Sequence, residues 1–440
     1  MSKGTVVLTN ARLWDGTGND VTPNATIRVA DGLITAVETG SAPAATGALD
    51  AGPTIDVGGA SVIPGLVDMH VHLTTSSERT KPVDNAIYRT LTTRPEKLLH
   101  GLRNAMRSLA SGFTTLRVMG HREVGEVELR DFIDRGWLPG PRLKVAPWPI
   151  SMTGGRGDLF LPTTVGREVW DTADGVEACR ALVRMQRKMG ADFIKVTASG
   201  GMLSSGDKPH WPNYTVDELR VIAEEAHTYD MRVAAHAHST EGIRRSLDAG
   251  IDSIEHGSFL TEELVAQMVE QGTYLVPTLA INQWILDRGR DSGATAEGIS
   301  KLEQAGHRQV ESVQMALVAG VKIAMGTDST GTICPLGHHA RELELMVACG
   351  MSPTGALASA TRVAAEALAL EHEQGTLEPG KIADLVVVNG DPTVDINVLR
   401  LPGGIRSVYR AGVDVSDPWP GLTEILRETD TLFPQVGAPA

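Results

Sequence analysis

The chain has 440 residues, and its 40 Lys and Arg residues against 54 Asp and Glu residues give a formal charge of −14 at pH 7. Because no dense run of basic residues offsets this acidic balance, we expect neither nucleic acid nor an anionic membrane surface as a partner. Apolar residues make up 42% and charged residues 21% of the chain, which is typical of globular proteins and excludes a disordered one.

The N-terminal segment and the cysteines indicate a cytoplasmic protein. The first residues, MSKGTVVLTNARLWDG, lack the apolar core and cleavage site of a signal peptide, and no run of about 18 apolar residues could span a bilayer. Cys179, Cys334 and Cys349 are odd in number and widely spaced. We therefore expect three free thiols, and neither a disulfide framework nor a Cys-ligated metal.

Both ends of the chain predict short β-strands joined by turns. Residues 5–38 contain strand-like runs separated by Asp-Gly pairs, which favour tight turns. Residues 375–391 and 405–415 show the same pattern of short strand-like runs and turn residues. We expect residues 1–61 and 371–440 to form one small composite domain, a β-sandwich.

The middle of the chain, residues 62–370, alternates short apolar segments with amphipathic helical patterns. Helices are expected at 94–112 and 215–230, and the second opens with a capping box of Thr215 and Glu218. Eight strand-like segments, each followed by a helix or a long loop, predict a (β/α)8 barrel of the TIM type. These segments are 62–70, 113–119, 142–146, 192–198, 232–238, 253–257, 274–279 and 321–328.

Four of the expected strands end in residue types that bind metal ions. Residues two apart in a strand point the same way, so an H-x-H pair can chelate one ion. A single pair is more often one packed and one solvated histidine, but four strand ends converge on one pocket in a barrel. The residues are His70 and His72 in the first strand region, His236 and His238 in the fifth, His256 in the sixth and Asp328 in the eighth.

Lys195 lies in the middle of the fourth strand, DFIKVTA, on the same face as Phe193 and opposite Ile194 and Val196. An isolated ammonium there would cost several kcal/mol to desolvate, and two nearby divalent cations would repel it. A carbamate formed by addition of carbon dioxide to the amine would instead be an anionic ligand able to bridge two metals. The other interpretation is a lysine that snorkels toward a nearby acid.

The order HVH, a strand lysine, then His, His and Asp resembles the amidohydrolase superfamily, in its binuclear subtype with a carboxylated lysine. The segments VIPGLVDMHVHL, HAHSTEGIRRSLDAGIDSIEHGSFL, GTDS and GTLEPGKIADLVVV are similar to the imidazolonepropionase-related branch, which contains Xaa-Pro dipeptidases (prolidases) and ochratoxin-type amidases. The likeness covers nearly the whole chain. It is specific for the superfamily and its metal centre, and less so for the substrate.

The resemblance implies two divalent metal ions, expected to be Zn²⁺, and a ligand role for each matching residue. The implied ligands are His70, His72 and Asp328 for the more buried ion, His236 and His256 for the second ion, and Lys195 as the carbamate that bridges both.

The resemblance also implies catalytic and substrate-binding residues. Asp328 matches the general base, His238 a residue that polarises the scissile carbonyl, and Arg244 a residue that pairs with the substrate carboxylate in the dipeptidases. One position departs from the pattern, because Arg156 stands where relatives commonly carry the histidine of GGHGD. An arginine there would favour an anionic group or a charged oxyanion.

The expected function is hydrolysis of an amide-type C–N bond in an N-acyl amino acid, dipeptide or aryl amide, by a hydroxide that bridges the metals. A carbamate or phenylurea hydrolase with the same centre is the main alternative. A mononuclear deaminase or cyclic amidase gives Lys195 no role, and an inactive scaffold has no need of a complete ligand set. We expect a small-molecule substrate and, by analogy with relatives, a homo-oligomer.

Overall fold

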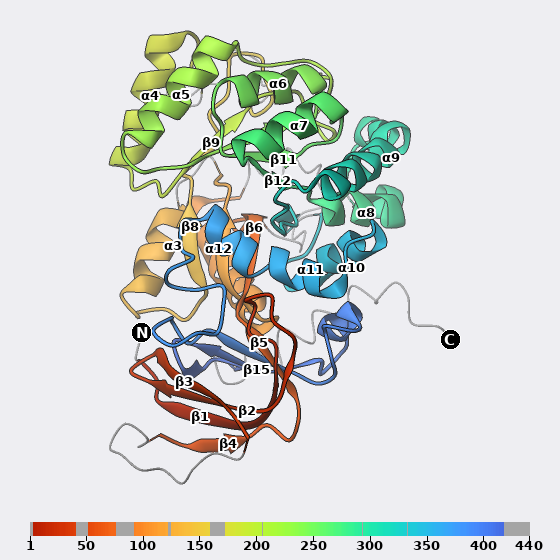
Figure 1. The fold of residues 1–440 in the computed structure, drawn as a ribbon. Helices are drawn as coiled ribbons and strands as arrows, with labels where there is room; N and C mark the ends of the chain where they lie inside the picture. The colour runs from red at the N-terminus through yellow and green to blue at the C-terminus, as the bar shows by residue number, and fades with distance from the viewer. Residues whose placement is uncertain are drawn as a thin grey trace.

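The computed structural model describes residues 3–40, 52–75, 92–121, 125–158, 172–204, 206–292, 294–331 and 333–417. Residues 418–440, which we expected to belong to the small domain, lie outside the described residues. A sheet built from both ends of the chain lies beneath a larger unit of strands and helices (Figure 1).

The small unit is one eight-stranded sheet with the order β16-β15-β14-β5-β1-β2-β3, and β4 pairs with β1. Because β5 pairs antiparallel with β14, the two ends of the chain share this sheet. Side chains of β1, β2, β5, β14 and β15 meet in one apolar cluster, so the sheet folds over its own core as in a sandwich. The strands are β1 Val6–Leu13, β2 Thr22–Ala30, β3 Leu33–Thr39, β4 Thr54–Asp56, β5 Ser61–Pro64, β14 Leu385–Val388, β15 Ile405–Arg410 and β16 Val413–Asp414.

The large unit contains two parallel four-stranded sheets, β13-β6-β7-β8 and β12-β11-β10-β9. Backbone hydrogen bonds link segments beside these edges: Ile150 N, which follows β8, donates to Lys195 O of β9 at 2.7 Å, and Leu275 N of β12 donates to Lys322 O at 2.9 Å. Within the expected eighth strand, 321–328, Ile323 forms an isolated bridge to Leu275, and β13 begins only at Ser329. The two parallel sheets and these links agree with the predicted barrel-type fold. The strands are β6 Leu66–His72, β7 Phe113–Val118, β8 Arg142–Val145, β9 Ile194–Thr197, β10 Val233–Ala237, β11 Ser253–His256, β12 Tyr274–Val276 and β13 Ser329–Thr330.

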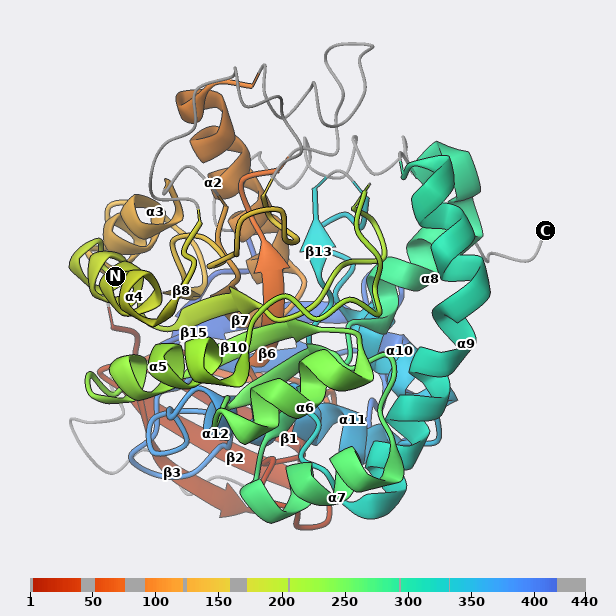
Figure 2. The ribbon, with the colours of Figure 1, turned by 90° about the horizontal axis from the view of Figure 1, so that it is seen from above.

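Helices surround these strands when the molecule is seen from above (Figure 2). The predicted capping box is present at the start of α5, where the side chains of Thr215 and Glu218 each bond the other's backbone N–H. The α-helices are α2 Arg94–Ala110, α3 Gly125–Asp134, α4 Val176–Lys188, α5 Val216–His227, α6 Thr240–Asp248, α7 Glu262–Gln271, α8 Leu279–Arg288, α9 Ala296–Ala319, α10 Ala340–Ala348, α11 Pro353–Ser359 and α12 Arg362–Ala367. Two 3₁₀ helices are η2 Gly289–Ser292 and η3 Ile396–Arg400.

The strand expected over 62–70 is divided at Gly65 into β5 of the small sheet and β6 of the barrel. A Cβ on Gly65 would lie 2.2 Å from Thr114 Oγ1 and 2.9 Å from Asp384 Cβ, so only glycine fits where the chain passes between the two units. The apolar run alone gave no sign of this change of sheet.

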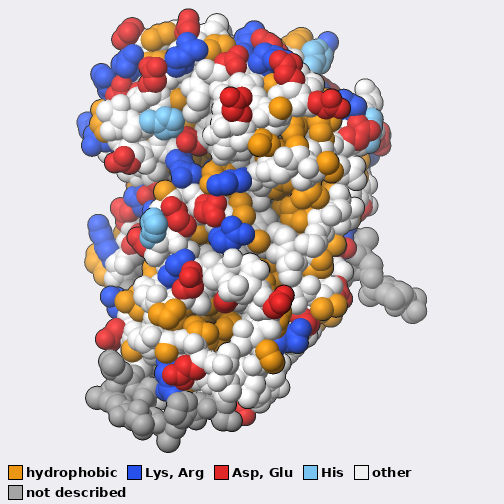
Figure 3. Space-filling model, in the orientation of Figure 1, with side chains coloured by type: hydrophobic (Ala, Val, Ile, Leu, Met, Phe, Trp, Pro, Cys, Tyr) orange, Lys and Arg blue, Asp and Glu red, His pale blue; other side chains and the backbone are white. Residues whose placement is uncertain are grey.

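Among the described helices, none is both long and apolar enough to cross a membrane. On the face shown in Figure 3, acidic and basic side chains are interspersed.

Candidate metal centre and active site

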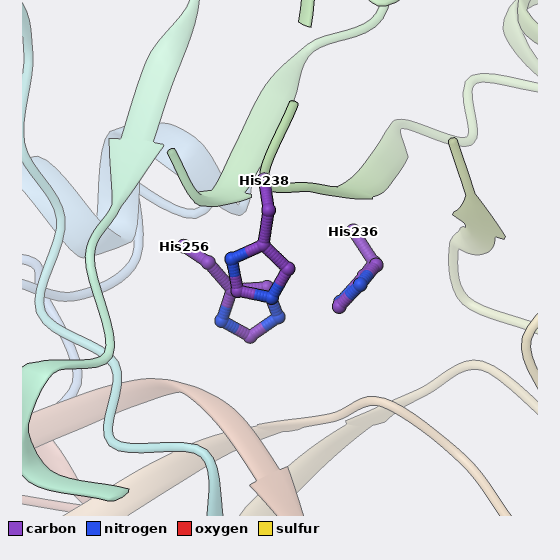
Figure 4. A group of neighbouring side chains, drawn as sticks. All are labelled: His236, His238 and His256. Carbon is purple, nitrogen blue, oxygen red and sulfur yellow. The ribbon is translucent and has the colours of Figure 1, made fainter. Parts of the chain in front are cut away.

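The candidate metal ligands converge in and beside the barrel strands, although they are far apart in the sequence; Lys195 lies within β9 and Asp328 just before β13. The ring centroids of His236 and His256 are 4.6 Å apart, and those of His70 and His256 are 5.1 Å apart. Figure 4 shows His236, His238 and His256 gathered around a common space. All of the candidate ligands are buried except His72, which is partly exposed.

Two adjoining groups of side chains could each hold a metal ion. In each group the ligand atoms all lie within 4.8 Å of one another, and His256 belongs to both groups. The groups are His236, His238 and His256, and His70, His256 and Asp328. His72 completes the second group, because its Nε2 lies 3.4 Å from Asp328 Oδ1. This arrangement suits two neighbouring ions.

Hydrogen bonds to one ring nitrogen orient the other toward the cluster. His70 Nδ1 donates to Glu255 Oε2 at 2.7 Å, and His256 Nδ1 lies 2.6 Å from Thr278 Oγ1. Both bonds leave Nε2 facing the cluster. Metal-binding histidines characteristically have such a partner, because it fixes the tautomer and the direction of the ring.

His72 and His236 have the same kind of backbone partner but use opposite nitrogens. His72 Nδ1 donates to the Gly120 carbonyl at 2.9 Å, which leaves Nε2 for a ligand. His236 instead points Nε2 at the Gly200 carbonyl, 3.3 Å away. Its Nδ1 is buried and has no hydrogen-bond partner among the described residues, so this nitrogen is the one free to bind a metal.

Lys195 is 2% exposed, and its Nζ has no hydrogen-bond partner in the described part of the chain. Burial lowers the pKa of its ammonium to about 7; the carboxylate of Glu255 opposes this shift, and the charge of Arg117 adds to it. A neutral amine is the form that adds carbon dioxide. The unsatisfied Lys195 Nζ and His236 Nδ1, in a set of imidazoles and one carboxylate, fit a pair of divalent ions.

The electrostatics of the site favour an ionised Asp328 and a neutral His238. Burial alone would raise the pKa of Asp328, but His70, His72 and Arg156 hold it below its usual range. Burial, reinforced by the charge of Arg156, lowers the pKa of His238 to about 3. At neutral pH the site therefore offers a carboxylate base and an uncharged imidazole.

Arg156 lies close enough to the cluster for its positive charge to lower the pKa values of Asp328, His236 and His238. Its Nε is buried without a hydrogen-bond partner, and the guanidinium forms no ion pair with any residue the structure describes. A Cβ on Gly201 would lie 2.5 Å from Arg156 Nε, so this glycine allows the close approach. Burial lowers the pKa of Arg156, while the nearby carboxylates of Asp328 and Asp207 oppose this shift, so the site holds a buried guanidinium whose Nε has no described partner.

The structure does not bring Arg244 to the cluster. Arg244 is on α6, and its guanidinium forms two hydrogen bonds with Glu263 of α7, at 2.7 and 3.1 Å. The Arg244 side chain is 33% exposed and that of Glu263 is 71% exposed. Both terminal nitrogens of the Arg244 guanidinium are therefore already paired with the exposed Glu263 carboxylate.

Sequence reasoning missed the buried charges that support the ligands. Arg117 donates to Met69 O at 2.6 Å, to Ser253 Oγ at 3.0 Å and to Glu255 Oε1 at 2.6 Å. Arg117 therefore holds in place the Glu255 carboxylate, which orients the His70 ring. The signal that singled out Lys195, a charge inside an apolar strand, is equally present at Arg117 in FTTLRVM and could have found it.

Segments 76–91 and 159–171, which border the site in sequence, lie outside the described residues.

Comparison with known proteins agrees with this geometry. Residues 61–415 match the family described as "Amidohydrolase family". Ochratoxinase from Aspergillus niger is 30% identical over 369 residues, covering 80% of this chain and 75% of that protein. A solved Xaa-Pro dipeptidase with bound methionine in its active site is 32% identical, with a TM-score of 0.85 over 93% of this chain and 99% of that one. Phenylurea hydrolase B, 23% identical with a TM-score of 0.75 over 99% of this chain and 100% of that one, shares the fold.

Proposed function

The chain belongs to the amidohydrolase family and is a hydrolase acting on C–N bonds, and from this premise we propose that it cleaves amide-type bonds at a binuclear metal centre. The proposed substrates are N-acyl amino acids, dipeptides or aryl amides. The observation that carries this proposal is the convergence of two adjoining ligand groups around a buried lysine amine with no described partner.

The proposed ligands divide into one set for each ion. Imidazoles would hold each ion, Asp328 would add its carboxylate and Lys195 would add a carbamate; Zn²⁺ is the proposed metal. When bound, two such ions supply a nucleophile from water at neutral pH and polarise a carbonyl oxygen. The proposed sets are His70, His72 and Asp328 for one ion and His236 and His256 for the other, with Lys195 shared.

Asp328 and His238 have complementary tasks in this proposal. The ionised Asp328 accepts the proton of the attacking water and delivers it to the departing nitrogen. His238 Nδ1 lies 2.8 Å from Ser258 Oγ. With the Ser258 hydroxyl as donor to Nδ1, the neutral imidazole carries its proton on Nε2 and donates it to the developing oxyanion.

We further propose that the substrate carries a carboxylate, and that Arg156 rather than Arg244 receives it. Arg156 is the guanidinium beside the cluster without an ion pair among described residues, whereas Arg244 is already engaged by Glu263. A neutral carbamate or phenylurea would form no ion pair with Arg156, so these substrates are the alternative.

Metal analysis of the purified protein tests the centre. We expect about two divalent ions per chain, and loss of both in Lys195→Ala, with partial rescue by short carboxylic acids that replace the carbamate. Lys322→Ala, which removes a lysine paired on the surface with Glu366, is the control and should retain the ions. One or no ion in the wild-type protein, or full metal content in Lys195→Ala, would refute the binuclear centre.

A further inference from the structure

A second polar cluster lies directly behind the candidate metal ligands. It joins Asp68 of β6, His339 at the start of α10 and Ser108 of α2, each 0% exposed. His339 Nδ1 donates to Asp68 Oδ2 at 2.6 Å, and His339 Nε2 lies 2.8 Å from Ser108 Oγ. Ser108 Oγ also lies 2.9 Å from the Asn104 carbonyl, so its one hydroxyl proton is within reach of that oxygen and of His339 Nε2.

This bonding order matches that of a serine nucleophile, histidine base and carboxylate, but the location excludes that chemistry. None of the three side chains is exposed, so no substrate reaches Ser108. The ring of His339 packs on Phe113 with centroids 4.6 Å apart, which fixes it within the core. The cluster therefore acts on its neighbours and not on a substrate.

The neighbours of Asp68 are the backbones that carry two metal ligands. Asp68 Oδ1 accepts from the backbone N–H of His70 at 2.9 Å and of Thr327 at 3.1 Å, and Oδ2 accepts from Thr327 Oγ1 at 2.7 Å. Thr327 immediately precedes Asp328, whose φ is +54° and whose N–H donates to His70 O at 2.8 Å. One carboxylate thus sets the spacing between β6 and the strained residue Asp328.

We propose that Asp68, His339 and Ser108 are positioning residues that hold His70 and Asp328 in metal-binding geometry. The four hydrogen bonds to Asp68 occupy both of its oxygens, so its carboxylate cannot rotate while His339 is in place. Loss of the His339 donor leaves Oδ2 with one partner fewer in a buried site and frees both ligand backbones to shift. The inference rests on the proposed metal centre.

Two replacements of His339 separate positioning from general support of the fold. An Asn amide nitrogen can take the place of Nδ1 and keep the bond to Asp68, whereas a Gln amide nitrogen takes the place of Nε2 and reaches only Ser108. In the metal-loaded full chain, His339→Gln should release metal to a chelator about 10–100-fold faster than wild type. His339→Asn should stay close to wild type, although both variants lose stability.

A matched pair of serine variants gives an independent measurement. Ser108 and Ser246 are both fully buried in helices and both bond the carbonyl four residues earlier, Ser246 through Gly242 O at 2.7 Å. Ser108→Ala should release metal several-fold faster than wild type, and Ser246→Ala should not. Unfolding of each metal-free variant is measured as well, so that a general loss of stability can be recognised.

The outcomes separate this inference from the proposed function. The positioning role is overturned if His339→Gln and Ser108→Ala release metal at the wild-type rate. It is also overturned if the release rate simply tracks the loss of stability in every variant. In both cases the proposed metal centre is unaffected. If His339→Gln does not fold, the Ser108→Ala and Ser246→Ala pair decides. A wild-type chain that binds no metal refutes the centre itself, and the positioning role with it.

Discussion

At the scale of single residues, the informative feature is a charge placed inside an apolar strand. Lys195, Arg117 and Asp68 all occupy such positions, and all are buried. Arg117 and Asp68 are fully engaged by hydrogen bonds, so their burial is compensated. Lys195 Nζ has no hydrogen-bond partner among the described residues, so its burial is not compensated in the same way.

Replacement of Arg156 by Met tests the carboxylate receptor. A charged hydrogen bond is worth roughly 1.5–3 kcal/mol, so kcat/KM should fall about 10–150-fold for an N-acyl amino acid. It should change little for the matching uncharged amide, which has no carboxylate to lose. Arg244→Met is the control and should leave both substrates nearly unchanged. Equal losses on the charged and uncharged substrates would contradict the assignment, as would a larger carboxylate-specific loss in Arg244→Met.

At the scale of elements, the backbone is strained at or next to several candidate ligands. His256, Thr278 and Asp328 have positive φ angles of 73°, 53° and 54°. Neighbouring helices hold these turns: Glu342 of α10 accepts the backbone N–H groups at the start of α8, at 2.9 and 2.6 Å, next to Thr278. Gln309 of α9 donates to the His256 carbonyl at 3.3 Å. Strain of this kind persists only where surrounding structure fixes it, which is typical of functional sites.

The link between α5 and β11 predicts a pH dependence of stability. His227 Nε2 donates a hydrogen bond to Asp252 Oδ2 at 2.8 Å, and this bond raises the pKa of His227 above its ordinary value of 6.5. Its contribution is therefore complete below pH 6.5 and is lost as pH rises through the folded-state value. The unfolding free-energy difference between wild type and His227→Gln should shrink as the pH rises from below 6.5 through the raised folded-state pKa of His227.

Urea unfolding of the metal-free protein measures this difference, since metal release would add its own pH dependence. His372→Gln is the control, because the His372 side chain is 92% exposed and should give no comparable trend. If the free-energy difference grew with pH, the expected direction of the His227 pKa shift would be wrong.

At the scale of the whole molecule, the two units share strands and not merely a surface. In β5, Val62 faces the small core and Ile63 faces the barrel core. In β14, Val387 and Val386 alternate in the same way, and each lies opposite its counterpart in β5. The small sheet is thus part of the barrel's packing. Homo-oligomer formation and a cytoplasmic location stay predictions.

Sharing of β5 and β14 predicts one cooperative unfolding transition. Val386→Ala and Val387→Ala remove buried methyl groups from different cores, and each should lower the free energy of unfolding by about 2 kcal/mol. Calorimetry should show one transition that shifts as a whole in both variants. Val318→Ala, at a side chain 90% exposed on α9, is the control and should shift it little. Two transitions, with only one displaced, would show that the units unfold separately.

The sequence by itself determined the barrel and the set of candidate ligands. Strand alternation places His70 and His72 together, and parallel barrel strands bring their ends to one pocket, so local pattern and a general rule of the fold are sufficient. The strand lysine, Lys195, was recognisable for the same local reason, because a charge interrupts an apolar run.

Only the tertiary structure decided which groups are paired and which are free. It places Arg244 against Glu263 and leaves Arg156 beside the cluster, and it joins Asp68 to His339, which is 271 residues away. The division of 62–70 at Gly65 likewise depends on distant packing. Periodicity reports the environment of a residue along its own element, whereas hydrogen-bond partners depend on how separate elements pack, and that information is not local.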